Sequence, residues 1–311
     1  MQPYDVIIIG AGPAGLTSAL YSARSKLNTL YLENLGVGGQ VAATDEIENY
    51  PGFSRGINGF DLSLQMEEQA QRFGAKPLLA KVLSLELADP YRIVKTTKGD
   101  FISKIIIIAS GAAPKSLNCP GELAFRAHGV SYCATCDGPF YEDANIIVVG
   151  GGNSAVEEAC YLTKFANKVS LVHRRDALRA TKIIQERALT NSKLEFIWNT
   201  VIQEIRGETT VNKVILKNLQ TDQFIEMPTD GIFIYVGNEP NTLFVKDLIE
   251  LMQEGYIETD EFMRTSIPGI YAVGDVRHKL LRQVVTAVSD GAIAAYHGEK
   301  YIEEYFPEKR N

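Results

Sequence analysis

The sequence lacks long apolar runs and long runs of positive charge, and each absence restricts its function. Its strongest apolar runs, such as residues 105–109 (IIIIA), are far shorter than the roughly 20 residues of a membrane span. The 311 residues carry a formal net charge of −7 without a Lys/Arg run, so no nucleic-acid partner is expected. The N-terminus resembles no signal peptide, and we expect a cytoplasmic protein without a membrane partner.

Cysteine and histidine are also scarce, with four of each. Cys133 and Cys136 form a CxxC, whereas Cys119 and Cys160 stand alone, so a zinc site would lack a second pair of ligands and no metal is predicted. In a reducing cytosol a close cysteine pair is more often catalytic or metal-binding than structural. The spacing allows a disulfide that a dithiol partner opens by exchange, which favours a redox pair. Cys160 is expected to be a buried apolar residue, and Cys119 is expected to be structural or neutral.

Two segments, residues 5–34 and 145–174, match each other without a gap. Each has a β-branched run, a glycine-rich turn, an amphipathic helix pattern and a second strand pattern. This is a βαβ unit with the G-x-G-x-x-G/A fingerprint, in which a pyrophosphate rests on the helix N-terminus. The expected binding residues are Gly10, Gly12, Pro13, Ala14 and Gly15 in the first copy, and Gly150, Gly152, Asn153, Ser154 and Ala155 in the second. The alternative, a tight turn without a ligand, is disfavoured by the matching flanks.

The two copies differ where their second strand pattern ends. In the first copy this position is Glu33, whose carboxylate would accept hydrogen bonds from ribose hydroxyls and repel a 2′-phosphate, so the site is expected to hold FAD or NAD. In the second copy the position is His173, followed by Arg174, Arg175 and Arg179. Guanidinium groups bind phosphate bidentately, so this copy is predicted to bind NADPH. A solvated charged turn is the alternative for this basic segment.

The length favours two domains, and Pro and Gly near residues 113–114 and 237–241 indicate two crossings between them. The predicted fold class is α/β with two Rossmann-like domains, the second inserted into the first. Residues 1–113 and 246–311 would form an FAD-binding domain, and residues 114–245 an NADPH-binding domain that carries the CxxC. Helices are expected over 61–73, with an Asp cap, and from Gln283 to Tyr305. Further strands are expected at 81–87, 91–96 and 101–108, as a small sheet of the first domain, and at 194–198, 201–206, 211–219 and 231–236 in the second.

Seven motifs occur in a characteristic order: GAGPAG, GGQ, ENYPG, GVSYCATCDG, GGGNSA, VHRRDALRA and GIYAVGD. Together they cover essentially the whole chain and resemble the low-molecular-weight thioredoxin reductases of bacteria, which are NADPH-dependent, FAD-containing oxidoreductases. The most specific part is CATCD followed closely by the second glycine motif. The resemblance implies FAD and NADPH as cofactors, thioredoxin as the partner and a homodimer.

The resemblance also implies further site residues. Those near FAD would be Glu33, Asn34, Gly38, Gly39, Gln40, Asn49, Ala109, Ser110, Gly111, Gly274, Asp275, Arg282, Gln283 and Val284. Ser110 stands where the family usually has Thr. Asp137, directly after the second cysteine, would act as a general acid or base for the thiols, with a solvated turn aspartate as the alternative.

The implied electron path runs from NADPH through FAD and the Cys133–Cys136 disulfide to oxidised thioredoxin. Because the CxxC and the NADPH motif share a domain, both must meet one flavin on the other domain, and we expect a rotation between the domains. A flavin dithiol oxidase or a ferredoxin-fed reductase is the alternative, but the NADPH motifs are intact here. A flavin-binding module without turnover is a third possibility.

Overall fold

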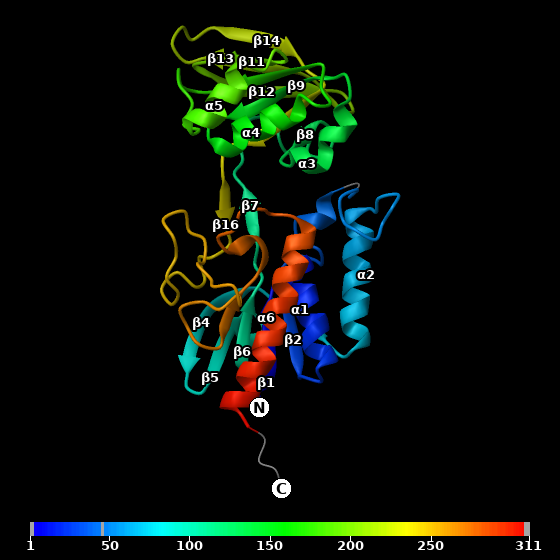
Figure 1. Ribbon diagram of the computed structural model, residues 1–311, viewed down its shortest axis with the longest axis vertical. Coiled ribbons are helices and arrows are strands. Elements are labelled where there is room, and N and C mark those ends of the chain that lie inside the picture. Colours follow the sequence, from blue (N-terminus) through cyan, green and yellow to red (C-terminus); the bar gives the residue numbers. More distant parts are fainter. Residues whose placement is uncertain (1–2, 45–46, 308–311) are drawn as a thin grey trace. The chain divides into compact units, whose positions relative to one another are not determined.

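The chain divides into two compact units in the computed structural model, which describes residues 3–44 and 47–307 (Figure 1). The first unit comprises Met1–Ala113 and Glu239–Asn311, and the second comprises Pro114–Asn238. The return to the first unit at Glu239 comes earlier than residue 246, where the sequence places it. Residues 1–2, 45–46 and 308–311 of the predicted first domain lie outside the described residues.

The first unit is built on one seven-stranded sheet. In sheet order its strands are β3 (Lys76–Leu79), β2 (Thr29–Glu33), β1 (Tyr4–Ile9), β6 (Gly99–Ile108), β5 (Tyr91–Thr96) and β4 (Val82–Ala88), with β17 (Ile270–Ala272) also pairing with β6. β6 pairs in parallel with β1 through residues 103–108 and antiparallel with β5 through 99–103. The three strands predicted as a small sheet of the first domain therefore form the antiparallel part of this sheet, because β6 is long enough to belong to both parts.

Apolar side chains cover both faces of this sheet. Ile105, Ile106, Ile107 and Ile108 of β6 are all fully buried, as expected for a central parallel strand. On one face lie α1 (Pro13–Arg24), α6 (Val284–Tyr305) and α2 (Gly59–Arg72), with α1 between the other two (Figure 1). On the other face Ile106 and Ile108 pack with Val245, Ile249 and Ile257 from an irregular segment.

The helix ends follow from local hydrogen bonding. α2 is capped by Asn58, whose Oδ1 accepts the N–H groups of Phe60 and Asp61 at 2.9 and 3.3 Å. The predicted cap at Asp61 was therefore wrong, and Asp61 instead lies in the first turn, where a negative charge is favourable. α6 begins at Val284 with a capping box between Gln283 and Thr286, close to its predicted start.

The second unit repeats the layout with a five-stranded sheet and a three-stranded sheet. The first has the order β11 (Leu194–Ile197), β10 (Lys168–Val172), β9 (Asn145–Gly150), β15 (Gly231–Tyr235) and β8 (Val130–Ser131), and the second has β12 (Thr200–Gly207), β13 (Val211–Asn218) and β14 (Phe224–Pro228). Its helices are α3 (Ala134–Asp137), α4 (Asn153–Leu162) and α5 (Lys182–Leu189). The chain also has short 3₁₀ turns at Val41–Ala43, Gly138–Tyr141 and Gly274–Val276. The predicted α/β fold class is confirmed.

The two crossings run through β7 (Ala112–Pro114) and β16 (Asn238–Pro240), which pair with each other. On the side of the first unit, Ser110 donates its hydroxyl to the Asn241 carbonyl at 2.7 Å. The Asn241 amide donates to the Ser110 carbonyl at 2.8 Å. These reciprocal bonds join the chain leaving the first unit to the chain that returns to it. Within the described ranges, no helix is both long and apolar enough to cross a bilayer.

The packing of α6 on α1 predicts a sharp contrast between two helical glycines. A Cβ at Gly291 would lie 2.3 Å from the backbone carbonyl oxygen of Ala14, which has no freedom to move away. Gly291→Ala is expected to lower the free energy of unfolding in urea by about 1–3 kcal/mol. The control is Gly298→Ala on the same helix, whose Cβ would collide at 2.3 Å with the flexible Cδ1 of Ile105 and would otherwise make only ordinary contacts at 3.8 Å. A smaller loss is expected there, and equal losses would contradict the argument.

Candidate active site

The first glycine loop follows β1 at the edge where β1 and β6 end. A Cβ at Gly10, which has φ +111°, would lie 2.3 Å from the carbonyl oxygen of Ala109, and one at Gly15 would lie 1.9 Å from that of Gly10. Both positions therefore require glycine for packing. A Cβ at Gly12 would meet only the carbonyl oxygen of Gly38, at 3.9 Å. The space beside Gly12 at the start of α1 thus suits a bound pyrophosphate.

Other residues predicted for FAD lie around this loop. Gly38 donates its N–H to the Ala11 carbonyl at 2.8 Å, which brings the predicted Gly38–Gly39 turn against Gly12. Glu33, at the end of β2, accepts the N–H of Ala11 at 2.9 Å and that of Asn34 at 2.7 Å. Its carboxylate is therefore held beside the loop, where a ribose is expected.

The Gly274–Asp275 turn also meets this loop. A Cβ at Gly274 would lie 2.9 Å from the Ala14 side chain. Oδ1 of Asp275 is buried and has no hydrogen-bond partner among the described residues. Burial raises the pKa of Asp275, and the neighbouring Lys279 and Arg282 oppose that rise. A buried carboxylate oxygen without a donor suits the hydroxyl groups of a flavin's ribityl chain, so these residues fit FAD.

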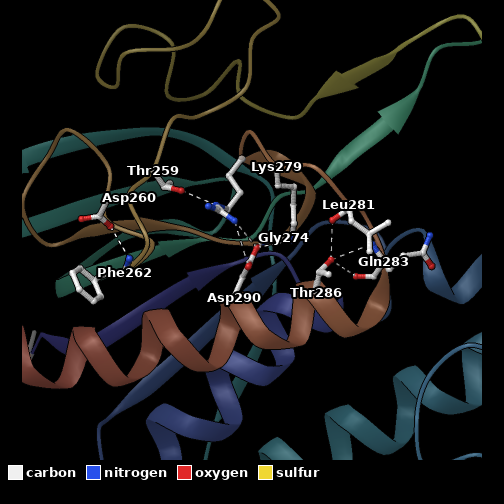
Figure 2. Close-up of polar contacts among 10 residues, drawn as sticks. Thr259, Asp260, Phe262, Gly274, Lys279, Leu281, Gln283, Thr286 and Asp290 are labelled. Atoms are coloured by element: carbon white, nitrogen blue, oxygen red, sulfur yellow. Dashed lines mark hydrogen bonds and ion pairs between the residues drawn. The ribbon is translucent and has the colours of Figure 1, made fainter. Parts of the chain in front are cut away.

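A buried ionic cluster around Asp290 of α6 holds the Gly274–Asp275 turn in place (Figure 2). Asp290 of α6 accepts the Gly274 N–H at 3.0 Å, the Lys279 ammonium at 2.7 Å and the Arg277 guanidinium at 3.4 Å. The Lys279 and Asp290 side chains are only 7% and 8% exposed. Sequence reasoning missed this cluster, although an aspartate on the apolar face of a long helix was a possible signal.

Two predicted site residues that are far apart in the sequence, Asn49 and Gln283, contact each other in the fold. The Asn49 amide donates to Oε1 of Gln283 at 3.1 Å, which joins the ENYPG segment to the start of α6. Arg282 places its guanidinium over the Tyr256 ring at 4.4 Å, and Val284 is the first residue of α6. Asn241, which sequence reasoning did not identify, holds the predicted Ser110–Gly111 turn.

The second glycine loop repeats the geometry of the first. A Cβ at Gly150 would lie 2.4 Å from the carbonyl oxygen of Tyr235, whereas one at Gly152 would meet nothing within 4 Å. The loop therefore needs its first glycine for packing and leaves space at its second, beside the exposed Asn153 and Ser154 that begin α4. This cradle fits a second dinucleotide.

The basic segment after β10 lies against this loop. The N–H groups of Arg179 and Ala180 donate to the Gly151 carbonyl at 2.7 and 3.2 Å. Arg174, Arg175 and Arg179 are exposed, and their side chains make no hydrogen bond or ion pair within the part of the chain that the structure describes.

His173 differs from the arginines that follow it. Its side chain is buried, and its ring packs so closely on Gly151 that a Cβ there would lie 2.2 Å from it. Burial, with Arg179 and Arg174 nearby, lowers the pKa of His173. A neutral, buried imidazole is a weaker phosphate ligand than an exposed guanidinium, so the arginines are the stronger candidates for the 2′-phosphate.

The CxxC forms a disulfide between Cys133 and Cys136, with the two Cα atoms 5.3 Å apart. Cys133 is the N-cap of α3, and Asp137 ends this short helix. Between the cysteines, the Ala134 N–H donates to the Tyr235 hydroxyl at 2.5 Å. Burial, with Glu158 nearby, raises the pKa of Tyr235 well above its ordinary value, so this hydroxyl is neutral. Tyr235 therefore joins the redox helix to Gly150 through its hydroxyl and its carbonyl.

A buried carboxylate anchors the segment before the disulfide. Glu122 is 1% exposed and accepts the Ser116 hydroxyl at 2.6 Å, the Leu117 and Asn118 N–H groups at 2.9 and 2.8 Å, and the Tyr132 hydroxyl at 2.7 Å. Burial alone would raise the pKa of Glu122, but these hydrogen bonds outweigh it and lower that pKa. Sequence reasoning missed Glu122, because three of its four partners, Ser116, Leu117 and Asn118, come from a loop without a motif.

The remaining cysteines are not part of this centre. Burial raises the pKa of Cys119 to about 11 and also raises the pKa of Cys160, so both thiols are poor nucleophiles. Cys160 packs against the core of the second unit, as expected. Across residues 3–44 and 47–307, no group of three or more His, Cys, Asp or Glu side chains is arranged to hold a metal ion.

Two dinucleotide cradles and a redox disulfide define a pyridine nucleotide-dependent disulphide oxidoreductase. The family model of pyridine nucleotide-disulphide oxidoreductases matches residues 4–291. The thioredoxin reductase of Peptoclostridium litorale is 50% identical over 98% of this chain and 99% of its own, and that of Bacillus subtilis is 47% identical over 97% and 95%. The crystal structure of the Streptococcus pyogenes thioredoxin reductase is 49% identical over 97% and 99%, with a TM-score of 0.93.

The chain belongs to the pyridine nucleotide-disulphide oxidoreductases and, within them, to the thioredoxin reductase family. It is an oxidoreductase whose cofactors are FAD and NADPH, as the sequence predicts. The predicted family is confirmed and is favoured over a dithiol oxidase or a ferredoxin-fed reductase.

Glu122 provides a test of how the redox segment is held. Glu122→Gln places an amide N–H₂ among hydrogen-bond donors, so the free energy of unfolding is expected to fall by about 2 kcal/mol at pH 7. The pKa of Glu122 in the folded protein lies below its ordinary value near 4.5. The stabilisation that its ionised carboxylate provides is therefore fully present above pH 4.5 and is lost as the pH falls through the pKa of the folded protein.

The stability difference between wild type and Glu122→Gln should therefore narrow below about pH 4.5. Urea unfolding from pH 3.5 to 8 measures it, with Glu208→Gln at an exposed glutamate of the same unit as the control. A difference that stays constant down to pH 3.5 would contradict the assignment.

Proposed function

We propose that this enzyme reduces the disulfide of thioredoxin with electrons from NADPH, through FAD and the Cys133–Cys136 pair. The observation that carries the proposal is the position of Tyr235, which contacts both the redox helix and the second glycine loop. The nucleotide cradle and the disulfide are thereby parts of one rigid framework. The names of the relatives support thioredoxin as the substrate.

The first unit would bind FAD through the cradle at Gly10–Gly15, with Glu33 toward the ribose and Asp275 toward the ribityl chain. When bound, FAD supplies two-electron transfer between a nicotinamide and a disulfide. Asp290, Lys279 and Arg277 would hold the Gly274–Asp275 turn in the position that this binding needs. Gln283 and Asn49, already hydrogen-bonded to each other, would face the flavin ring.

The second unit would bind NADPH with its pyrophosphate at Gly152 and the N-terminus of α4. The exposed guanidinium groups of Arg174, Arg175 and Arg179 would bind the 2′-phosphate, because each offers paired N–H donors to phosphate oxygens. Backbone bonds from Arg179 and Ala180 to Gly151 hold this basic segment beside the cradle.

The reduced pair would transfer its electrons by thiol–disulfide exchange. One thiolate attacks a sulfur of the thioredoxin disulfide, that S–S bond breaks, and the leaving thiolate takes a proton. The second thiolate of the pair then attacks the mixed disulfide, which restores the Cys133–Cys136 bond and releases reduced thioredoxin. Asp137 would supply and recover the proton as a general acid and base.

Rotation of one unit relative to the other, a homodimer and a cytoplasmic location also belong to this proposal. The rotation is proposed because the disulfide and the NADPH cradle belong to one unit, whereas the FAD cradle belongs to the other.

An anaerobic titration tests the electron path. Addition of NADPH to the flavoprotein should bleach the flavin absorbance, and oxidised thioredoxin should restore it.

The Cys136→Ser variant should still bind FAD, and its flavin should still bleach with NADPH. Its rate of thioredoxin reduction should fall at least about a thousandfold, because no disulfide can form. The matched control is Cys160→Ser, a lone cysteine in the same unit, which should keep full activity. Thioredoxin turnover by Cys136→Ser at the wild-type rate would disprove the relay.

The arginines give a separate test of nucleotide choice. Arg174→Ala and Arg175→Ala should each raise the KM for NADPH by about tenfold, because each removes a charged hydrogen-bond pair to the 2′-phosphate. The KM for NADH should change little. Steady-state kinetics with both nucleotides measure this, with Arg187→Ala on α5 as a control for loss of charge. Equal losses for NADPH and NADH would argue against a 2′-phosphate site.

A further inference from the structure

Ser131 is a buried serine beside the redox pair. It is the last residue of β8 and is only 4% exposed. Its backbone pairs with Phe233 of β15, which is fully buried. The Ser131 hydroxyl therefore projects from the end of a short edge strand that is paired with the buried strand β15.

The Ser131 hydroxyl contacts both Asp137 and Cys133. Its oxygen lies 2.5 Å from Oδ2 of Asp137, and it accepts the backbone N–H of Cys133 at 3.1 Å. The Cys133 carbonyl oxygen, the alternative acceptor for the hydroxyl proton, is farther away at 3.4 Å. A hydroxyl has one proton to donate, so it donates to Asp137 and accepts from Cys133.

We infer that Ser131 positions Asp137 for proton transfer, by binding its Oδ2 while holding the first cysteine of the pair. The inference rests on the proposed role of Asp137. A donor at Oδ2 favours placing the transferable proton on Oδ1, so that the same oxygen gives and recovers it. The leaving thiolate of thioredoxin takes this proton, and Asp137 regains one from the remaining thiol of the pair as the enzyme disulfide closes. Each exchange thus leaves Asp137 in its starting state.

Asp137 lies near two partly buried tyrosines whose hydroxyl groups are uncharged near neutral pH. Its field acts on Tyr141 and Tyr235, and burial raises the pKa of both, to about 12 for Tyr141 and well above the ordinary value for Tyr235. Glu158 and Asp230 act on these tyrosines in turn. The thiols of the reduced pair also titrate in any pH profile. The effect of Ser131 on the pH dependence of kcat is therefore measured in two backgrounds, one with Asp137 and one in which Asp137 is replaced.

A double-mutant cycle with the full-length flavoprotein tests the inference. Ser131→Ala should lower kcat with oxidised thioredoxin by about tenfold, and leave the KM for NADPH unchanged. Because the hydrogen bond from Ser131 favours the ionised carboxylate, its loss should move the alkaline limb of the kcat profile to higher pH by about one unit. In an Asp137→Asn background, Ser131→Ala should change kcat less than about twofold and leave the profile unmoved.

Two further variants separate positioning from folding. Ser131→Thr retains a hydroxyl and a good strand former, and should restore kcat to within about twofold of wild type. Ser170→Ala removes an equally buried serine from β10 of the same unit and should have no effect on kcat. FAD content and near-ultraviolet circular dichroism confirm that each variant is folded.

Three results would overturn the inference. A further tenfold loss from Ser131→Ala in the Asp137→Asn background would show that Ser131 acts independently of Asp137. Failure of a folded Ser131→Thr variant to recover would show that the hydroxyl is not what matters. Full activity of Asp137→Asn alone would refute the proton-transfer role of Asp137, and this inference with it, while the NADPH titration would still test the electron path separately.

Discussion

The architecture depends on one close approach that occurs in each unit, between the first glycine of a loop and the end of the neighbouring strand. Gly10 lies against Ala109, which follows β6, and Gly150 lies against Tyr235, the last residue of β15. In both sheets this is where the strand order reverses, which is the position at which open α/β sheets bind nucleotides, outside the carboxyl ends of the strands. A side chain at either glycine would collide with the backbone of the neighbouring strand end, at 2.3 Å for Gly10 and 2.4 Å for Gly150, and would distort the loop. Close packing and ligand binding therefore impose the same requirement.

The irregular segments are held by buried carboxylates. Asp290 accepts hydrogen bonds from Lys279, Arg277 and a backbone N–H. Glu122 accepts hydrogen bonds from two hydroxyls and two backbone N–H groups. Burying a carboxylate is costly unless its oxygens are fully hydrogen-bonded. A buried carboxylate therefore has all its hydrogen bonds in one arrangement of its donors, and the other arrangements are higher in free energy. The result is a defined conformation in two segments where neither a helix nor a strand would supply one.

Patterns that repeat along the chain predicted the fold and much of the candidate site. The two βαβ units, the central strands and α6 follow from apolar periodicity and glycine spacing, which are local signals. β3 and β14 were missed because their residues are mostly exposed and give no apolar alternation. The cap at Asn58 was missed because Asp61 is an equally good cap by residue type. Asp290, Glu122 and Asn241 were missed because their partners are chosen by the folded chain and leave no fixed spacing.

Three anchors of the redox segment belong to the second unit. Ser131 is held by Phe233, Ala134 by the Tyr235 hydroxyl, and Tyr132 by Glu122. These three contacts lie within the second unit and support the local geometry of the disulfide there. A rotation between the units would therefore carry the disulfide, Asp137 and the nucleotide cradle as one body. The same thiols could then meet the flavin in one arrangement and a partner protein in another without being rebuilt.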